Sequence, residues 1–330
     1  MVNIVFDDLE KSPVSQDDYP LIHQLANTVR NHLLTSNSTV TVLLKLFEQI
    51  HARDLYANKE SPTIESIRDC VEKRFPTLIL SAHRGVDEEG DIIWAQIYTP
   101  KIPDTKRIGG CDEIKIDDGI RALPKACPPI YINQHLFTYL LQAPESLLYD
   151  ASQLMFIVTL LHELAHSLAR GVLGAFITTP EGVGPPNRDG SSIRGEIGWA
   201  FELELFGGRI FVDFKRGVYQ EMLNVLFRPN DSNNTYSLLV DPAIVRCTVE
   251  SLSTQEIKPL KAVGGLADAP PEGVTRQRVT YEIVTATTLD AGAAPRIGLG
   301  YDIVRLSTGG DVVVGEGPDS DPENWGIGRT

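Results

Sequence analysis

The stretch Thr159–Leu168, TLLHELAHSL, contains the pattern His162-Glu163-x-x-His166. The pattern lies inside one continuous predicted helix. Residues four apart on a helix share a face about one turn apart, so both imidazoles point the same way. Two such histidines can bind one zinc ion, and the glutamate beside the first can reach a water on that metal.

The residues around this pattern predict a buried helix. The run Leu154–Leu161 is almost wholly apolar, which predicts burial on most sides. Burying two histidines and a glutamate without partners costs free energy, and a metal would remove that cost. Asp150 with Gln153 resembles a capping box at the helix start, and Gly171 would end the helix. The alternative is a core helix whose histidines are hydrogen-bonded.

Composition narrows the class of protein. A chain of 330 residues with 42% hydrophobic content can bury a large core. The formal net charge of -14 argues against a nucleic-acid partner and against adhesion to anionic membranes. The sequence contains neither a signal-peptide pattern nor an apolar run of membrane-spanning length, so we expect a cytoplasmic protein. The four cysteines are expected to be reduced structural thiols because they form no CxxC pair.

The spacing of apolar residues predicts an α+β fold in three parts. Residues 1–60 would form a helical region, with helices at 20–34 and 39–52 after a loose, acidic leader. Residues 61–254 would form the catalytic domain, which begins with a helix at 64–74. Residues 255–330 are rich in Gly, Pro, Thr and Val, and would form a β-rich region that ends in a flexible tail.

Four segments of the predicted catalytic domain bear on the site. The β-branched runs at 77–81 and 92–98 flank an acidic turn and predict a hairpin. The run PIYIN at 129–133 predicts a strand before the motif helix. Residues 218–227 have helical spacing. Residues 178–192 contain three prolines and three glycines, which predicts a loop that is either a wall of a substrate cleft or a mobile insertion.

A third metal ligand has to come from another element. A catalytic zinc usually takes three protein ligands and one water. No histidine follows His166, so an acidic residue is expected. The helix predicted at 194–208 offers Glu196, Glu202 and Glu204.

A helical wheel separates these glutamates. Glu202 falls on a face with Gly195 and Gly198, where the small residues would let another helix approach closely and bury the carboxylate. A zinc ion would then be its partner. Glu196 is the alternative, and it lies near the helix start, where the macrodipole favours a carboxylate without any metal. The predicted ligands are His162, His166 and Glu202.

With these residues, the sequence resembles the gluzincin branch of the zincin metallopeptidases. The resemblance covers Pro129–Gly208 and rests on the HExxH pattern followed by a glutamate on a second helix. It implies a zincin-like core, with a small mixed sheet, the HExxH helix and a second helix that carries the glutamate ligand. The strand at 129–133 would then be the edge strand that aligns an extended peptide beside the cleft.

The predicted activity is zinc-dependent hydrolysis of peptide bonds by a zinc-bound water, with Glu163 as the general base. The expected cofactor is Zn²⁺, and the expected partner is a peptide or a small amide substrate. Two alternatives stay open, namely a zinc hydrolase that acts on a non-peptide amide or biosynthetic intermediate, and a non-catalytic binding protein. A further donor should stabilise the oxyanion. The candidates for that donor are Tyr131, His135, Arg194 and Tyr219.

Overall fold

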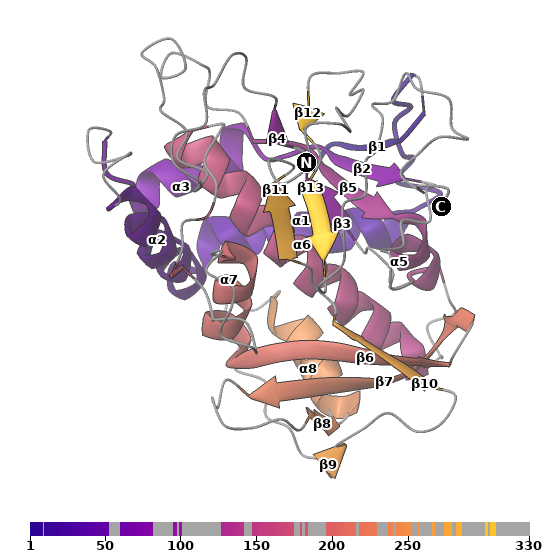
Figure 1. The fold of residues 1–330 in the computed structure, drawn as a ribbon. Coiled ribbons are helices and arrows are strands. Elements are labelled where there is room, and N and C mark those ends of the chain that lie inside the picture. The colour runs from indigo at the N-terminus through magenta and orange to yellow at the C-terminus, as the bar shows by residue number, and fades with distance from the viewer. Residues whose placement is uncertain are drawn as a thin grey trace, which may run out of the picture.

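A single long helix, α6 (Leu147–Leu173), crosses the centre of the structure, and helices and strands pack around it (Figure 1). The structure is a computed structural model with mixed helices and strands. It describes residues 1–8, 10–52, 60–81, 95–97, 99–100, 127–141, 147–174, 179, 182–183, 196–215, 218–229, 237–239, 242–252, 257, 266–267, 274–278, 282–285, 301–302 and 304–307.

Helix α6 is the core helix of the fold. Every residue from 151 to 173 is buried. Within the described part of the chain, α6 is the one helix long and apolar enough to cross a membrane, and its apolar window is entirely enclosed by the rest of the structure. The predicted buried helix is therefore confirmed.

The predicted ends of α6 are wrong. The helix starts at Leu147, so Asp150 lies in its first turn, where its carboxylate accepts a hydrogen bond of 2.9 Å from Arg246 Nε. The helix also continues through Gly171. Gly174, with φ 145°, follows the last helical residue. A glycine tolerates that backbone conformation, whereas Gly171 has a packing role that is described below.

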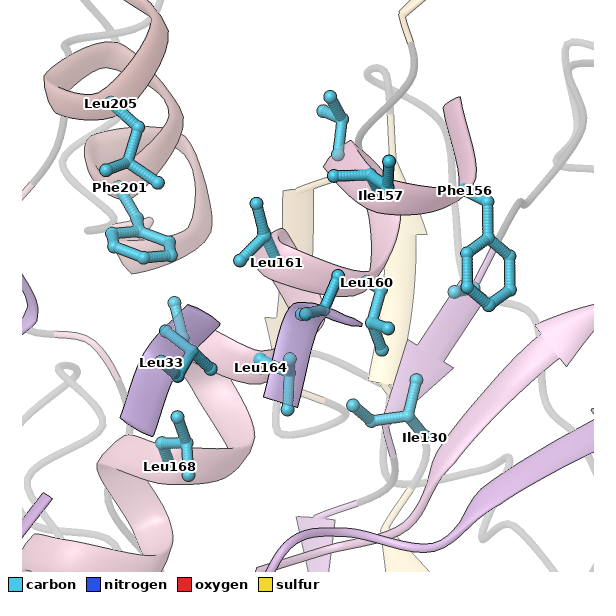
Figure 2. Close-up of a cluster of buried hydrophobic side chains, with 14 of the residues drawn as sticks. Leu33, Ile130, Phe156, Ile157, Leu160, Leu161, Leu164, Leu168, Phe201 and Leu205 are labelled. Atoms are coloured by element: carbon cyan, nitrogen blue, oxygen red, sulfur yellow. The ribbon is translucent and has the colours of Figure 1, made fainter. Parts of the chain in front are cut away.

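Leucines on successive turns of α6 hold its neighbours together (Figure 2). They pack toward helix α1 (Pro20–Thr35), helix α7 (Ile197–Phe206) and strand β5 (Ile130–Asn133). Each fully buried side chain of this size stabilises the fold by about 1.5–3 kcal/mol. The labelled side chains of this cluster are Leu33, Ile130, Phe156, Ile157, Leu160, Leu161, Leu164, Leu168, Phe201 and Leu205.

Three N-terminal helices form one side of the structure. The two helices predicted before residue 60 are confirmed as α1 and α2 (Asn37–His51), and α3 (Ile64–Lys73) follows. The side chain of Ser36 caps α2 by accepting from the backbone N–H of Thr39 at 3.3 Å. All three helices pack against α6, and α2 also packs against α7. One continuous core thus joins the predicted N-terminal region to the predicted catalytic domain.

The first sheet has the strand order β1-β2-β5-β3. Strands β1 (Ile4–Phe6), β2 (Leu78–Ser81) and β5 run parallel, and β3 (Ala95–Ile97) is antiparallel to β5. The predicted hairpin of 77–81 with 92–98 is wrong, because both runs pair with β5. The strand at 129–133 is therefore internal, and among the described strands of this sheet β1 and β3 lie at the two ends. Apolar runs indicate strands but do not identify their partners.

The predicted loose leader is also wrong. Its strand β1 pairs with β2, and the side chains of Val2, Ile4 and Val14 are buried. The acidic residues of the segment suggested solvation, but its apolar residues complete a sheet whose next strand lies more than 70 positions further along the chain. Local composition carries no signal for such a contact.

A second, antiparallel sheet has the order β10-β6-β7-β8-β9. The prediction of a helix at 218–227 is wrong, since this segment is strand β7 (Val218–Pro229) paired with β6 (Gly208–Lys215). Apolar residues dense enough to fit a helical face also fit a strand buried on both sides. The other three strands are β8 (Ser237–Leu239), β9 (Leu266–Ala267) and β10 (Val274–Arg278).

The remaining elements complete the description. Beyond residue 255, the elements in the described part are all strands, as predicted for that region. The predicted tail and nearly all of the predicted loop at 178–192 lie outside the described residues. The short elements are α5 (Gln134–Tyr139), α8 (Pro242–Ser251), β4 (Thr99–Pro100), β11 (Glu282–Thr285), β12 (Tyr301–Asp302) and β13 (Val304–Ser307).

Candidate metal centre

Helix α6 brings its two histidines together as the four-residue spacing predicts. The ring centroids of His162 and His166 lie 5.3 Å apart at an interplanar angle of 47°. Both side chains are buried. One ring nitrogen of each histidine and one carboxylate oxygen of Glu196 all lie within 4.8 Å of one another. This buried group of two imidazoles and one carboxylate could hold a metal ion.

Glu196 reaches this position because it is the N-cap of α7. Its carboxylate accepts hydrogen bonds from the backbone N–H groups of Gly198 at 3.3 Å and Trp199 at 2.8 Å. The same two oxygens face the imidazoles. Oε2 lies 3.4 Å from Nε2 of His162, and Oε1 forms a close ion-pair contact with Nε2 of His166. The cap therefore fixes the carboxylate between both rings.

Glu202, the residue predicted as third ligand, binds the other nitrogen of the first histidine. Its Oε1 lies 2.9 Å from Nδ1 of His162. An ionised carboxylate only accepts hydrogen bonds, so Nδ1 donates to it, and Nε2 is the nitrogen that can act as a ligand once the ring is neutral. The structure thus brings Glu196, the alternative, into the candidate ligand group and places Glu202 behind His162.

The helical wheel failed because of where α7 begins. The wheel treated 194–208 as one helix that includes Glu196. Helix α7 begins only at Ile197, and Glu196 precedes it with extended backbone, at φ -137° and ψ 98°. A helical wheel therefore does not give the direction of its side chain. The same wheel placed Glu202 correctly on a buried face that meets α6.

Gly198 allows α7 to approach the first histidine closely. A Cβ at this position would lie 2.4 Å from both Cε1 and Nε2 of the His162 ring, closer than non-bonded atoms can approach. The prediction that a glycine here permits close helix packing is confirmed for Gly198, whereas Gly195 lies outside the described residues.

Replacing Gly198 by alanine should therefore weaken metal binding. The added methyl group has to displace the His162 ring, and we expect the affinity for a divalent metal ion to fall at least about tenfold, as when a residue that supports a ligand is lost. A competitive metal titration measures this effect. Circular dichroism is the control for folding, since alanine has a higher helix propensity than glycine. Wild-type affinity in this variant would contradict the close approach.

The donor atoms of this group fit a metal ion. The Nε2 atoms of His162 and His166 are buried, and neither has a partner with hydrogen-bond geometry among the described residues. Hydrogen bonding within the core accounts for Nδ1 of His162, whereas these two atoms face the carboxylate of Glu196 without hydrogen-bond geometry. Buried nitrogens without such partners are costly, and a metal ion removes that cost.

The charges of the group influence one another strongly. Burial opposes protonation of His162, but the carboxylates of Glu196 and Glu202 outweigh it and raise the pKa of His162 to about 9. Burial lowers the pKa of His166, in spite of the nearby carboxylate. Burial opposes ionisation of Glu196, yet the two imidazoles dominate and lower its pKa. The cluster therefore attracts positive charge.

Glu163 and Arg170 form the other charged part of the centre. Burial and the negative charge of Glu196 raise the pKa of Glu163 to about 7, whereas His162 and Arg170 act in the opposite direction. Burial lowers the pKa of Arg170 to about 10, although Glu163 opposes that shift. Sequence reasoning missed this buried cation. Arg170 could have been found from its position seven residues after Glu163 on a largely apolar helix, because that spacing puts both side chains on one face.

The candidates for an oxyanion donor are only partly described. Tyr131 lies on β5 and packs with Val5 and Ile79, whereas its neighbours Ile130 and Ile132 belong to the core that contains α6. Alternation along a strand thus points Tyr131 away from α6. Arg194 and the side chains of His135 and Tyr219 lie outside the described part of the structure.

Comparisons of the chain with protein-family models, with curated proteins and with solved structures find no match.

Proposed function

We propose that this protein is a zinc metallopeptidase with a zincin-like core, in which His162, His166 and Glu196 hold the metal. The observation that carries the proposal is the buried group of these three side chains, with Glu163 next to the first of them. Two imidazoles and one carboxylate are a common ligand set for catalytic zinc. When bound there, zinc would supply a Lewis acid that polarises the scissile carbonyl and acidifies a water.

Glu163 is proposed as the general base. It would take a proton from the attacking water and return it to the leaving amine. In the metal-free centre burial raises the pKa of Glu163 to about 7, and the positive charge of a bound zinc would favour the carboxylate form that accepts the proton. Glu202 would hold the His162 ring through Nδ1, and Glu196 would be held by the N-terminal N–H groups of α7.

Strand β3 supports a peptide substrate over a small amide. It lies at one end of the described strands of the first sheet, is antiparallel to β5 and packs against α6, and β13 also contacts it. An extended peptide can pair with a strand in that position through main-chain hydrogen bonds, independent of its side chains. A small amide has no such backbone to pair.

Zinc binding should release a proton below pH 9. Zinc binds neutral imidazole. The pKa of His162 is raised to about 9, so in the metal-free protein the ring is an imidazolium at neutral pH and has to lose its second proton before zinc can bind. Zinc affinity should therefore rise about tenfold per pH unit from pH 7 and level off above pH 9. Calorimetry in buffers of different ionisation enthalpy measures the released proton. Affinity independent of pH over this range would contradict the charge state assigned to His162.

The proposal is tested by the cleavage of a proteome-derived peptide mixture, read by mass spectrometry of new termini. We expect new termini with the zinc-loaded protein, none after treatment with a strong chelator, and recovery when zinc is added back. Cleavage that persists in the chelated protein would contradict the metal mechanism. A zinc-loaded protein that cleaves no peptide but hydrolyses small amides would move the assignment to the non-peptide alternative.

A further inference from the structure

Two cysteines that are far apart in the sequence lie side by side against Gly171 of helix α6. Cys70 lies on α3, and Cys127 precedes β5 by three positions. Their Sγ atoms lie 3.2 Å apart, about 1.2 Å beyond the length of a disulfide bond. Cys70 is fully buried, while Cys127 is partly exposed.

Gly171 of α6 makes room for both sulfurs. A Cβ at this position would lie 2.3 Å from the Sγ of Cys127 and 2.7 Å from the Sγ of Cys70. A side chain there would therefore drive the two sulfurs away. Arg74 Nη1 also donates to the carbonyl of Gly171 at 2.9 Å, and Ser167 Oγ donates to the carbonyl of Pro128 at 2.8 Å. These contacts hold α3 and the start of β5 against α6.

We propose that Cys70 and Cys127 are a dithiol site that closes to a reversible disulfide in the folded protein. The oxidant is a low-molecular-weight disulfide such as glutathione disulfide. Closure needs only a small movement of each sulfur, and the glycine of α6 leaves space for it. The site is separate from the proposed metal centre, so neither proposal depends on the other.

The exchange starts at Cys127, the more exposed of the two residues. The Cys127 thiolate attacks one sulfur of glutathione disulfide, the reagent S–S bond breaks, and one glutathione leaves. Cys70 then loses its proton and attacks the mixed disulfide at Cys127, which expels the second glutathione. Two protein thiols are thus oxidised to one disulfide, and one glutathione disulfide is reduced to two thiols that take up both protons.

Closure would link α3 to the strand that enters the centre of the first sheet. The two cysteines are 57 positions apart, so the bond would restrict the unfolded chain more than the folded one. We therefore expect the oxidised protein to unfold at a temperature several degrees higher than the reduced protein. Hydrogen bonding to Cys70 and burial raise the pKa of the Cys127 thiol, so exchange should be faster at about pH 9 than at neutral pH.

The test uses the full chain with Cys111→Ser and Cys247→Ser, which removes the other two cysteines. Glutathione disulfide should lower its intact mass by about 2 Da, peptide mapping should recover a Cys70–Cys127 link, and dithiothreitol should reverse the change. Adding Cys70→Ser should give a glutathione adduct of about 305 Da at Cys127 instead. Adding Cys127→Ser should give no adduct, because Cys70 is buried.

Two results would overturn the proposal. One is an unchanged mass, with both thiols still open to alkylation after unfolding. The other is a Cys70–Cys127 disulfide that forms only in denaturant, which would mean that the folded chain does not hold the two sulfurs close enough to bond. The wild-type chain is oxidised and mapped for the same Cys70–Cys127 link in parallel, so that misfolding of the serine variant is not mistaken for either result.

Discussion

Replacing Glu163 by glutamine should reduce peptide cleavage by about 100- to 10,000-fold, the range typical for loss of a general base. Glutamine keeps the size of the side chain but cannot take up a proton at its amide. The residue is buried and follows His162 directly in the chain, where its carboxylate would accept a proton from the attacking water. The measurement is the initial rate of cleavage of a peptide identified from the mixture.

The control for this substitution is the zinc content of the variant. Glu163 is not in the group of His162, His166 and Glu196, so the variant should bind zinc with stoichiometry equal to wild type. Unchanged cleavage with zinc bound would rule out Glu163 as the base. Loss of zinc would show instead that this carboxylate is itself a ligand.

Replacing Glu196 by glutamine should reduce zinc affinity by more than about 100-fold, beyond the range typical for residues that only support a ligand. The substitution removes the charge that faces both imidazoles, while a neutral amide oxygen can still cap α7. The measurement is a competitive zinc titration. Glu202→Gln should weaken zinc binding less, by about 10- to 100-fold, because Glu202 contacts only Nδ1 of His162.

Glu204 supplies the matched control on the same helix. Its carboxylate pairs with Lys45 at 2.7 Å, and its side chain is 43% exposed. Glu204→Gln should leave zinc affinity unchanged, since exposed ion pairs contribute little. If Glu202→Gln abolished binding and Glu196→Gln left it intact, Glu202 would be the third ligand and the cap at Glu196 would be purely structural.

The central helix and its two histidines could be predicted from sequence because their signals are local. The apolar run, the four-residue spacing of the histidines and the need of buried histidines for a polar partner can all be read from Leu154–Leu168. The first three helices could be predicted on the same basis. The packing role of Gly198 could be predicted as well, since a glycine on a buried helix face has few other functions.

The remaining features depend on contacts between distant residues. The choice between Glu196 and Glu202 depended on where the helix begins. Helix α7 begins at residue 197, not at the predicted residue 194, and the pattern of apolar residues does not determine such a boundary. The pairing of β1 with β2 and the position of β5 inside the sheet require partners that lie far away in sequence. The contact of Cys70 with Cys127 is of the same kind, because only the packing around α6 brings them together.

The most direct test of the metal centre is the zinc content of the wild-type protein, purified without added metal, measured by plasma mass spectrometry together with zinc X-ray absorption. We predict about one zinc per chain, with two imidazole nitrogens among its ligands and the remaining ligands oxygen. A folded protein that contains no metal, and that takes up none when zinc is supplied in slight excess, would contradict the proposal and leave the buried histidines with a structural role only.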